Sequence, residues 1–407
     1  MKKERINLVP DPVKCSGCGA CLAVCPRRAI EMRENQTGCK YPVIDEAACV
    51  GCGQCTAICP YQADGDATLP LEAYAAAGKT EKLVQNSASG GVFVSLAMSW
   101  IQSGGLVAGA VMDCTERLQV YHILSGKAED VQRMQGSKYV QSDAWRCYAE
   151  VVRALQEGKR VLFSGTPCQA AAIRKLTGNP ANLTTLELIC HGVPPLRMLD
   201  EYAAILGRRF GGRVSALTFR DKSVGRQFCA RIDVRRGVKK RSYYLRPSLL
   251  SFYRHFLSGA IYRENCYTCP YARPERESDL TIGDYWGIEK RHAEEIRTGQ
   301  MPLRGDWSCV LVNTGKGQRL LEEHGGDMRL YATRPEWVAE ENQQLRRPSA
   351  RPDNREALLQ QYEKGGYAAV EKAFVAGCGG ALRYQVRVFR QLRENEKARK
   401  DCKGSAK

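Results

Sequence analysis

The spacing of apolar and polar residues separates a short N-terminal segment from a long segment in which helices and strands alternate. Residues 92–102 have the apolar periodicity of a helix, and residues 106–112 have the composition of a buried strand. The alternation continues, with further helices predicted at 144–157, 169–176, 196–210 and 248–258, and further strands at 118–124, 160–163, 183–189, 280–283 and 309–313. This order predicts an α/β domain with a mixed sheet.

Three predicted strands interrupt the alternation. Residues 214–220, 228–235 and 239–245 follow one another without intervening helices, which favours an antiparallel arrangement. Residues 67–81 are rich in alanine and are predicted to be a linker or a short helix, and the chain after residue 334 has a helical, increasingly polar pattern. We therefore expect four parts: a module at 1–66, a linker at 67–81, a domain at 82–334 and a helical, basic extension at 335–407.

Eight of the 19 cysteines form a repeat in the first part. Each half has the spacing C-x2-C-x2-C-x3-C-P, ending at Pro26 and at Pro60. This spacing is typical of bacterial-type ferredoxins with two 4Fe-4S clusters, in which the fourth cysteine of each half binds the other cluster. We expect an α+β ferredoxin-like module with one cluster on Cys15, Cys18, Cys21 and Cys59 and another on Cys49, Cys52, Cys55 and Cys25. Zinc knuckles or a disulfide framework are the alternatives, which two copies with both prolines disfavour.

Length and charge restrict the number of domains, the cell compartment and the class of partner that we expect. The 407 residues suffice for two or three domains, and neither a signal segment nor a run of about 18 apolar residues is present, so we expect a cytoplasmic protein of an anaerobic cell. The net charge is +17, yet residues 1–66 hold eight basic and eight acidic side chains. The basic excess therefore lies downstream, where it suits phosphate-bearing cofactors, other acidic partners or simply a solvated surface. Nucleic-acid binding is disfavoured because no recognition motif accompanies the charge.

A second group of cysteines follows the predicted strands of the long domain. Cys168 and Cys190 each come just after a buried strand, and parallel strands bring such ends to one edge of a sheet. Cys266 and Cys269 form a C-x-x-C-P pair on a loop. Four thiols from three loops can hold a third 4Fe-4S cluster or a structural zinc ion. We favour the cluster because two others are predicted in the same chain.

Several short turns have the composition of a phosphate site. Ser87, Ser89, Gly90 and Gly91 precede a predicted helix, whose N-terminal amides attract anions. Lys138 lies in a flexible Gly-Ser-Lys-Tyr turn, Thr166 begins another helix, and Asp284 ends a strand beside two aromatic residues. An ordinary helix cap, or an aromatic plug at a strand end, remains the alternative for each. The C-terminal helix is basic and amphipathic, which suits a surface helix or a peripheral membrane contact.

Taken in order, these motifs resemble the coenzyme F-420 hydrogenase/dehydrogenase beta-subunit family, with a two-cluster ferredoxin fused at the N-terminus. The motifs are Ser-Ala-Ser-Gly-Gly at 87–91, Gly-Ser-Lys-Tyr at 136–139, Phe-Ser-Gly-Thr-Pro-Cys-Gln at 163–169, Cys-His-Gly at 190–192, the Cys266–Cys269 pair and Asp-Leu-Thr-Ile-Gly-Asp at 279–284. The resemblance implies an α/β domain that binds FAD and its own cluster. It makes Cys168, Cys190, Cys266 and Cys269 the ligands of that cluster and places Ser89, Gly90, Gly91, Lys138 and Thr166 against FAD.

The resemblance also implies a reaction. Electrons would pass between 4Fe-4S clusters and FAD, and a hydride would pass between FAD and coenzyme F-420 or a similar two-electron substrate. The implied partners are a redox partner protein or a soluble ferredoxin and a small-molecule substrate. A non-catalytic electron-transfer subunit, a reductase of a different small organic substrate, and a basic interaction protein with purely structural clusters are the competing hypotheses.

Overall fold

The cysteine repeat folds into the same local structure twice. The computed structural model describes residues 8–9, 11–61, 67–224, 229–302 and 306–404. Two short helices, α1 (Ala20–Val24) and α2 (Gln54–Ala57), each begin after a glycine in the left-handed conformation, Gly19 with φ 78° and Gly53 with φ 73°. Glycine adopts this conformation at little cost, which explains its recurrence between the second and third cysteines. A 3-10 turn, η1 (Pro12–Lys14), and the antiparallel hairpin of β1 (Ile30–Glu34) and β2 (Lys40–Ile44) complete the module.

An eight-stranded mixed sheet forms the body, and it confirms the predicted fold class. Its order is β13-β3-β12-β11-β7-β6-β4-β5, and β11, β7, β6 and β4 run parallel. The strands are β3 (Glu72–Gly78), β4 (Leu106–Asp113), β5 (Gln119–Ser125), β6 (Val161–Gly165), β7 (Leu183–Leu188), β11 (Leu280–Asp284), β12 (Ser308–Val312) and β13 (Met328–Thr333). The carboxyl ends of β6, β7 and β11 therefore meet at one edge of the sheet, where ligands gather in such folds.

Residues 67–81, predicted to be a linker or a short helix, contain a strand of the large sheet instead. Glu72–Gly78 is a sheet strand, β3, paired with β12 and β13. Its alanines have a high helix propensity, and the strand has no β-branched residue, so the sequence does not predict a strand. In the sheet, Ala75 and Ala76 are completely buried on opposite faces, so small side chains suit the close packing on both sides. The strand β13 was not predicted from the sequence.

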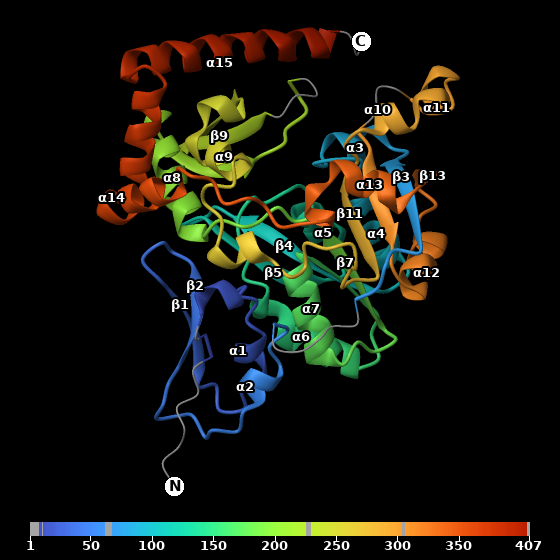
Figure 1. Ribbon diagram of the computed structural model, residues 1–407. Coiled ribbons are helices and arrows are strands. Elements are labelled where there is room, and N and C mark those ends of the chain that lie inside the picture. The colour runs from blue at the N-terminus through green and yellow to red at the C-terminus, as the bar shows by residue number, and fades with distance from the viewer. Residues whose placement is uncertain (1–7, 10, 62–66, 225–228, 303–305, 405–407) are drawn as a thin grey trace.

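Helices cover both faces of the large sheet (Figure 1). The apolar side chains of α4, α5 and α12 pack on one face, and those of α6 and α7 pack on the other. Within the described part of the chain, no helix combines the length and apolar character needed to cross a bilayer. The helices between β3 and β13 are α3 (Glu81–Gln85), α4 (Val92–Gln102), α5 (Ala128–Met134), α6 (Trp145–Gln156), α7 (Pro167–Thr177), α8 (Leu196–Arg209), η2 (Pro247–Leu249), α9 (Ser251–Leu257), η3 (Glu264–Thr268), α10 (Ile288–Arg291), α11 (Ala293–Arg297) and α12 (Gly315–His324).

A smaller antiparallel sheet stands beside the body, as the three consecutive strands predicted. Its order is β10-β9-β8, and residue 228 of the predicted second strand lies outside the described residues. The helices α14 and α15 pack against this sheet and against α8 and α9, whereas α13 and η4 pack on β3 of the large sheet, and Figure 1 shows α15 at the far end from the N-terminal module. The elements are β8 (Arg213–Thr218), β9 (Ala230–Arg236), β10 (Lys239–Leu245), α13 (Pro335–Glu341), η4 (Gln343–Leu345), α14 (Arg355–Gly377) and α15 (Ala381–Gly404).

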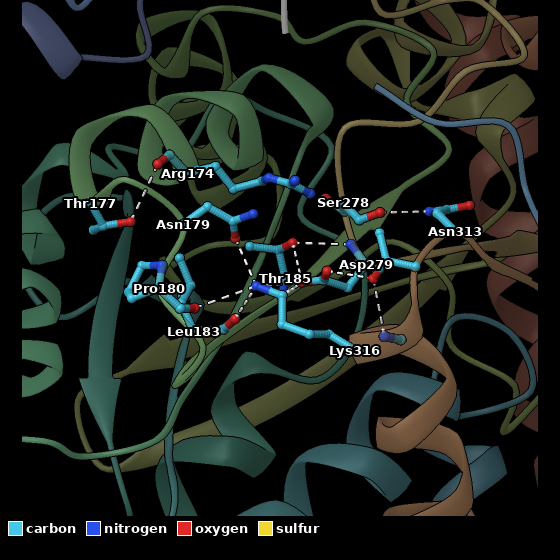
Figure 2. Close-up of polar contacts among 12 residues, drawn as sticks. Arg174, Thr177, Asn179, Pro180, Leu183, Thr185, Ser278, Asp279, Asn313 and Lys316 are labelled. Carbon is cyan, nitrogen blue, oxygen red and sulfur yellow. Dashed lines mark hydrogen bonds and ion pairs between the residues drawn. The ribbon is translucent and has the colours of Figure 1, made fainter. Parts of the chain in front are cut away.

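A buried polar network fixes the amino end of the parallel strands (Figure 2). The Asp279 carboxylate accepts hydrogen bonds from the backbone amide and hydroxyl of Thr185, at 2.7 and 2.8 Å. It also accepts one from Thr314 at 2.7 Å, and the Lys316 ammonium lies 3.8 Å away while donating to the Leu183 carbonyl at 2.7 Å. Asp279 therefore joins β11, β7 and α12, at the opposite end from Asp284.

Polar contacts hold the N-terminal module on the body. The Lys40 ammonium lies 2.7 Å from the buried carboxylate of Asp143, which precedes α6. Lys175 of α7 donates to the Cys59 carbonyl at 3.0 Å. Gly19 packs so tightly on Trp145 that an added Cβ would lie 2.6 Å from that side chain. The module is thus fixed over α6 and α7, next to the carboxyl end of β6.

Candidate metal centres

The first predicted ligand set, Cys15, Cys18, Cys21 and Cys59, is brought together and is called site I here. The charge of Cys59 acts on both Cys15 and Cys21, although Cys59 comes from the other half of the repeat. Burial raises the pKa of Cys18 to about 12 and also raises that of Cys15. Buried thiols of this kind ionise only when a cation replaces the proton, as iron does.

The second predicted set, Cys25, Cys49, Cys52 and Cys55, lines a single cavity and is called site II. The cavity lies against Ile30 and Ile44 of the hairpin. Cys52 is exposed, whereas Cys55 is buried. Cys25 contributes from the first half of the repeat, in keeping with the crossed ligation that the spacing predicts. Site II therefore lies closer to solvent than site I.

The third predicted set, Cys168, Cys190, Cys266 and Cys269, also converges and is called site III. Cys168 is the second residue of α7, Cys190 follows β7, and Cys266 and Cys269 lie on and just after η3. The charges of Cys168, Cys266 and Cys269 all act on Cys190. Burial raises the pKa of Cys266 and that of Cys269, each to about 12. The prediction that strand ends bring these thiols to one sheet edge is consistent with this geometry.

Sites I and III are neighbours. The charge of Cys168 acts on Cys15 and on Cys18, so a site III thiol lies within electrostatic reach of two site I thiols. The Thr166 hydroxyl lies 3.2 Å from the Cys168 sulfur. Because α1 packs on α6 and α7, the module presents site I directly to the loop that carries Cys168. No feature of the sequence predicts this adjacency.

The surroundings of these thiols fit iron–sulfur clusters. The side-chain hydroxyls of Ser16, Tyr148 and Tyr271 are buried and have no hydrogen-bond partner in the described part of the chain. Each lies within electrostatic or hydrogen-bonding reach of Cys168. Buried donors of this kind need acceptors, which the sulfides and thiolates of a cluster would supply.

The cysteines are also in the right chemical state. All eighteen cysteines that the structure describes are free thiols. Among the described residues, no three His, Cys, Asp or Glu side chains converge closely enough to hold one metal ion.

The loop predicted to bind FAD lies at the carboxyl edge of the sheet. Ser87 accepts a hydrogen bond from Gln135 at 2.7 Å, and Ser89 donates to the Trp307 carbonyl at 3.0 Å. The amide of Gly90 donates to Ser308, and an added Cβ there would lie 2.4 Å from the Ala76 carbonyl oxygen. Gly91 caps α4 with φ 85°. These glycines are explained by packing and backbone conformation, and FAD contact at this loop stays a prediction.

Lys138 and Thr166 are engaged within the protein. The Lys138 ammonium donates to four backbone carbonyls at the end of α5, at 2.6 to 3.1 Å. Burial lowers the pKa of Lys138 to about 7, although these carbonyls favour the charged form. Thr166 forms a capping box with Gln169 at the start of α7. Both residues thus hold helix ends, which is the alternative that the sequence left open.

Asp284 is the centre of a charged group that sequence reasoning only partly identified. Its carboxylate pairs with the Arg220 guanidinium at 2.6 Å, and its charge reaches His191. Lys222 bridges Asp306, at 3.0 Å, and the Ser89 carbonyl, at 2.8 Å. Burial lowers the pKa of His191, so the imidazole is neutral near pH 7. Two cations, two carboxylates and an imidazole therefore lie beside the loop that carries Ser89.

Arg220, Lys222 and the aromatic residues between this group and site III were missed from the sequence. Tyr262 lies within electrostatic reach of Cys190 and Cys266 on one side and of Tyr139 on the other. Gly192 permits its approach, since a Cβ there would lie 2.4 Å from the Tyr262 ring. Single Arg, Lys and Tyr residues among many carry no local signal, and only the fold selects them.

Two sets of four thiols in the N-terminal module and a third set at the strand ends are typical of an iron–sulfur redox protein. Comparison with known families shows which iron–sulfur proteins this chain resembles. Residues 158–336 match the C-terminal part of the coenzyme F420 hydrogenase/dehydrogenase beta subunit, and residues 14–63 match a 4Fe-4S dicluster domain. Residues 158–336 are therefore similar to this beta-subunit family, and residues 14–63 add a dicluster domain on their N-terminal side.

Relatives of known sequence agree with this assignment. One of the subunits of the F(420)H(2) dehydrogenase of Methanosarcina mazei is 28% identical over 177 residues, which are 40% of this chain and 49% of that protein. An uncharacterized protein of Methanocaldococcus jannaschii is 28% identical over 208 residues, 42% of this chain and 55% of that one. The chain thus spans about half the length of the curated relatives it matches.

One solved structure resembles the fold distantly. It is the F420-reducing NiFe hydrogenase complex from Methanosarcina barkeri, with 14% identity and a TM-score of 0.41. The match covers 74% of this chain and 97% of that one. A likeness of this size adds no argument about the site, and the family assignment rests on the sequence matches.

Proposed function

We propose that this protein is a flavin-dependent iron–sulfur oxidoreductase. In this proposal it passes electrons between three 4Fe-4S clusters and FAD, and exchanges a hydride with coenzyme F-420 or a similar two-electron substrate. The observation that carries the proposal is the neighbourhood of Cys168 to Cys15 and Cys18, since it gives the dicluster module a direct route into the larger domain. Residues 1–66 would be the electron-transfer unit. Residues 82–334, together with β3 from the predicted linker, would be the catalytic domain.

The exposure of the thiols supports an order for the three clusters. Site II has the exposed Cys52 and would meet a soluble ferredoxin or another redox partner. Site I, which has no exposed cysteine and adjoins Cys168, would be the intermediate station, and site III the terminus. Such clusters and free thiols require a reducing compartment, so we place the protein in the cytoplasm.

The charged group at Asp284 supports the flavin part of the proposal. When bound, FAD would link one-electron transfer by the clusters to two-electron hydride transfer. Arg220 and Lys222 would hold its phosphates, and the loop at Ser89 would border it. His191, kept neutral by burial, is suited to hold or accept a proton near Asp284. The basic surface would attract the phosphate and acidic tail of coenzyme F-420.

A second function has its own support. Lys138 is engaged by four carbonyls, and Gly90 packs on the Ala76 carbonyl, so two predicted FAD contacts already have partners inside the protein. This favours an electron-transfer subunit whose partner protein carries out the two-electron chemistry.

Anaerobic purification followed by iron, sulfide and flavin analysis tests both functions. The leading proposal requires about 12 iron atoms and one FAD per chain. About 12 irons without flavin would favour the electron-transfer subunit, and about eight irons without flavin would overturn the third cluster as well. The substrate follows from reducing the protein and offering coenzyme F-420, a nicotinamide cofactor and a quinone in turn, with bleaching of only one as the expected result.

A further inference from the structure

Arg263 is a completely buried arginine at the junction of the two domains. Its side chain is 0% exposed, although it lies on the loop between α9 and η3. Nη2 donates to the carbonyl oxygen of Cys15 at 3.1 Å, and Nη1 donates to the carbonyl oxygen of Lys40 at 3.0 Å. Nη1 also donates to Oε1 of Gln141 at 3.0 Å, and Nε contacts Asn265. The guanidinium therefore binds the N-terminal module and the body at once.

The positive charge of Arg263 has no carboxylate to balance it. In the described part of the chain, its hydrogen-bond acceptors are two backbone carbonyls and two amide oxygens, and no ion pair includes it. The Tyr41 ring lies 4.6 Å from its Cζ atom, which adds a cation–π contact. Burying an unbalanced charge is costly, and neutral acceptors offset only part of that cost. By contrast, the other fully buried arginine, Arg276, pairs with the carboxylate of Glu187.

The thiols of two predicted clusters surround this cation. Arg263 is within electrostatic reach of Cys15 in site I and of Cys266 and Cys168 in site III. A 4Fe-4S cluster on four thiolates carries a net negative charge, and nearby charge helps to set its reduction potential. Two such anions on either side would supply the missing countercharge.

We propose that Arg263 is the shared counter-ion of the clusters at sites I and III. It is a positioning residue that favours the reduced, more negative form of both clusters and binds the module to the body where electrons cross. This inference rests on the proposed clusters at the two sites. Site II, which Arg263 does not contact, provides an internal reference within the same molecule.

Redox titration followed by EPR spectroscopy tests the proposal, with the full-length variant Arg263→Gln compared with the wild type. The potentials of sites I and III should both fall by about 60 mV or more, a tenfold change in a one-electron equilibrium. The potential of site II and the iron content should not change. The conservative variant Arg263→Lys, which keeps the charge, should restore most of the shift.

Arg197→Gln is the matched control. Arg197 also joins the module to the body, through the Gln36 carbonyl and the Tyr362 hydroxyl at 2.9 Å, yet none of the predicted ligands is among its partners. All three potentials should stay unchanged in this variant. If Arg263→Gln does not fold, Gln141→Glu replaces it, because a carboxylate 3.0 Å from Nη1 would neutralise the cation in place. It should lower the same two potentials.

The outcomes separate this inference from the function it rests on. Unchanged potentials at sites I and III in Arg263→Gln, or in Gln141→Glu if only that variant folds, would overturn the counter-ion role while leaving the clusters in place. A shift of all three potentials together would also overturn it, since a global change in the protein would then be the cause. Wild-type protein with only about eight irons would instead refute the third cluster.

Discussion

Nη2 of Arg263 donates a hydrogen bond of 3.1 Å to the carbonyl oxygen of Cys15, although 248 residues separate the two in the sequence. The bond joins the first cysteine of the ferredoxin-like repeat to the loop that carries Cys266. Site I is thereby held against site III. The dicluster module is positioned as part of the larger domain by specific polar contacts.

Replacing Cys168 with alanine should remove one cluster. Iron content is expected to fall from about 12 to about eight atoms per chain, because site III loses one of its four ligands. Iron and sulfide analysis after anaerobic purification measures this. Cys114→Ala is the control, since Cys114 follows β4 and lies near Asp200 and Arg213, with none of the predicted ligands among its charged neighbours, and it should keep all the iron. Equal iron in both variants would contradict the assignment of site III.

The cluster at site II should be the most sensitive to oxygen. Cys52 is exposed and lines the cavity of site II, whereas none of the four site I cysteines is exposed and α1 packs against α6 and α7. Brief exposure to air, followed by reduction and EPR spectroscopy, should therefore show one signal lost before the others. Cys52→Ala should remove that same signal. Loss of all signals at one rate would contradict the prediction that oxygen reaches site II more easily than the other sites.

Asp284→Asn should weaken flavin retention without changing the iron content. The substitution removes the charge that pairs with Arg220 at 2.6 Å, so the guanidinium loses its fixed position beside the proposed FAD site. The flavin-to-iron ratio after gel filtration measures the effect, and we expect a decrease of at least about tenfold in flavin affinity, or about 1.4 kcal/mol. Asp200→Asn is the control, since this carboxylate pairs with Arg117 and not with Arg220. Normal flavin content in Asp284→Asn would contradict a role for Asp284 in flavin binding.

Stability should decrease as the pH falls below neutrality because of His122. Burial lowers the pKa of His122 from 6.5 to about 4, so the unfolded state binds a proton that the folded state does not between these values. His122 alone should lower the free energy of unfolding by about 1.4 kcal/mol from pH 7.5 to 5.5, and its contribution should level off below pH 4. Urea titrations measure it.

The variant His122→Gln provides the control for this pH effect. Glutamine keeps a donor for the Ser164 carbonyl, which lies 3.0 Å from Nε2 of His122, but it does not titrate. The slope should be reduced but not abolished, because burial also lowers the pKa of His255 to about 4. An unchanged slope would assign the effect to other groups.

Asp279→Ala should destabilise the fold by about 3 kcal/mol without loss of any cluster. The substitution leaves the amide and hydroxyl of Thr185 and the hydroxyl of Thr314 without their acceptor in a buried site. The midpoint of urea unfolding measures the change, and Asp327→Ala, on the exposed turn before β13, is the comparison. Equal midpoints in the two variants would show that the network of Figure 2 is dispensable.

The sequence predicted most elements, and the exceptions have physical causes. Val92–Gln102 is a helix with the expected bounds, because its apolar periodicity and the glycines after it act locally. The strand β3 was mistaken for a linker because alanine has little strand preference, and its place in the sheet depends on partners more than 200 residues away. The FAD contacts were predicted from turn composition, which does not distinguish a cofactor site from a helix cap.

The sequence by itself determined the chemistry of this protein, because cysteine spacing is a local property that iron–sulfur clusters require. It predicted the crossed pairing of the two repeats and, through strand ends, the gathering of Cys168 and Cys190. Only the tertiary structure decided that sites I and III adjoin and that a buried Arg263 lies between them. Such a relationship depends on how two domains pack, and long-range packing leaves no periodic or local pattern in the chain.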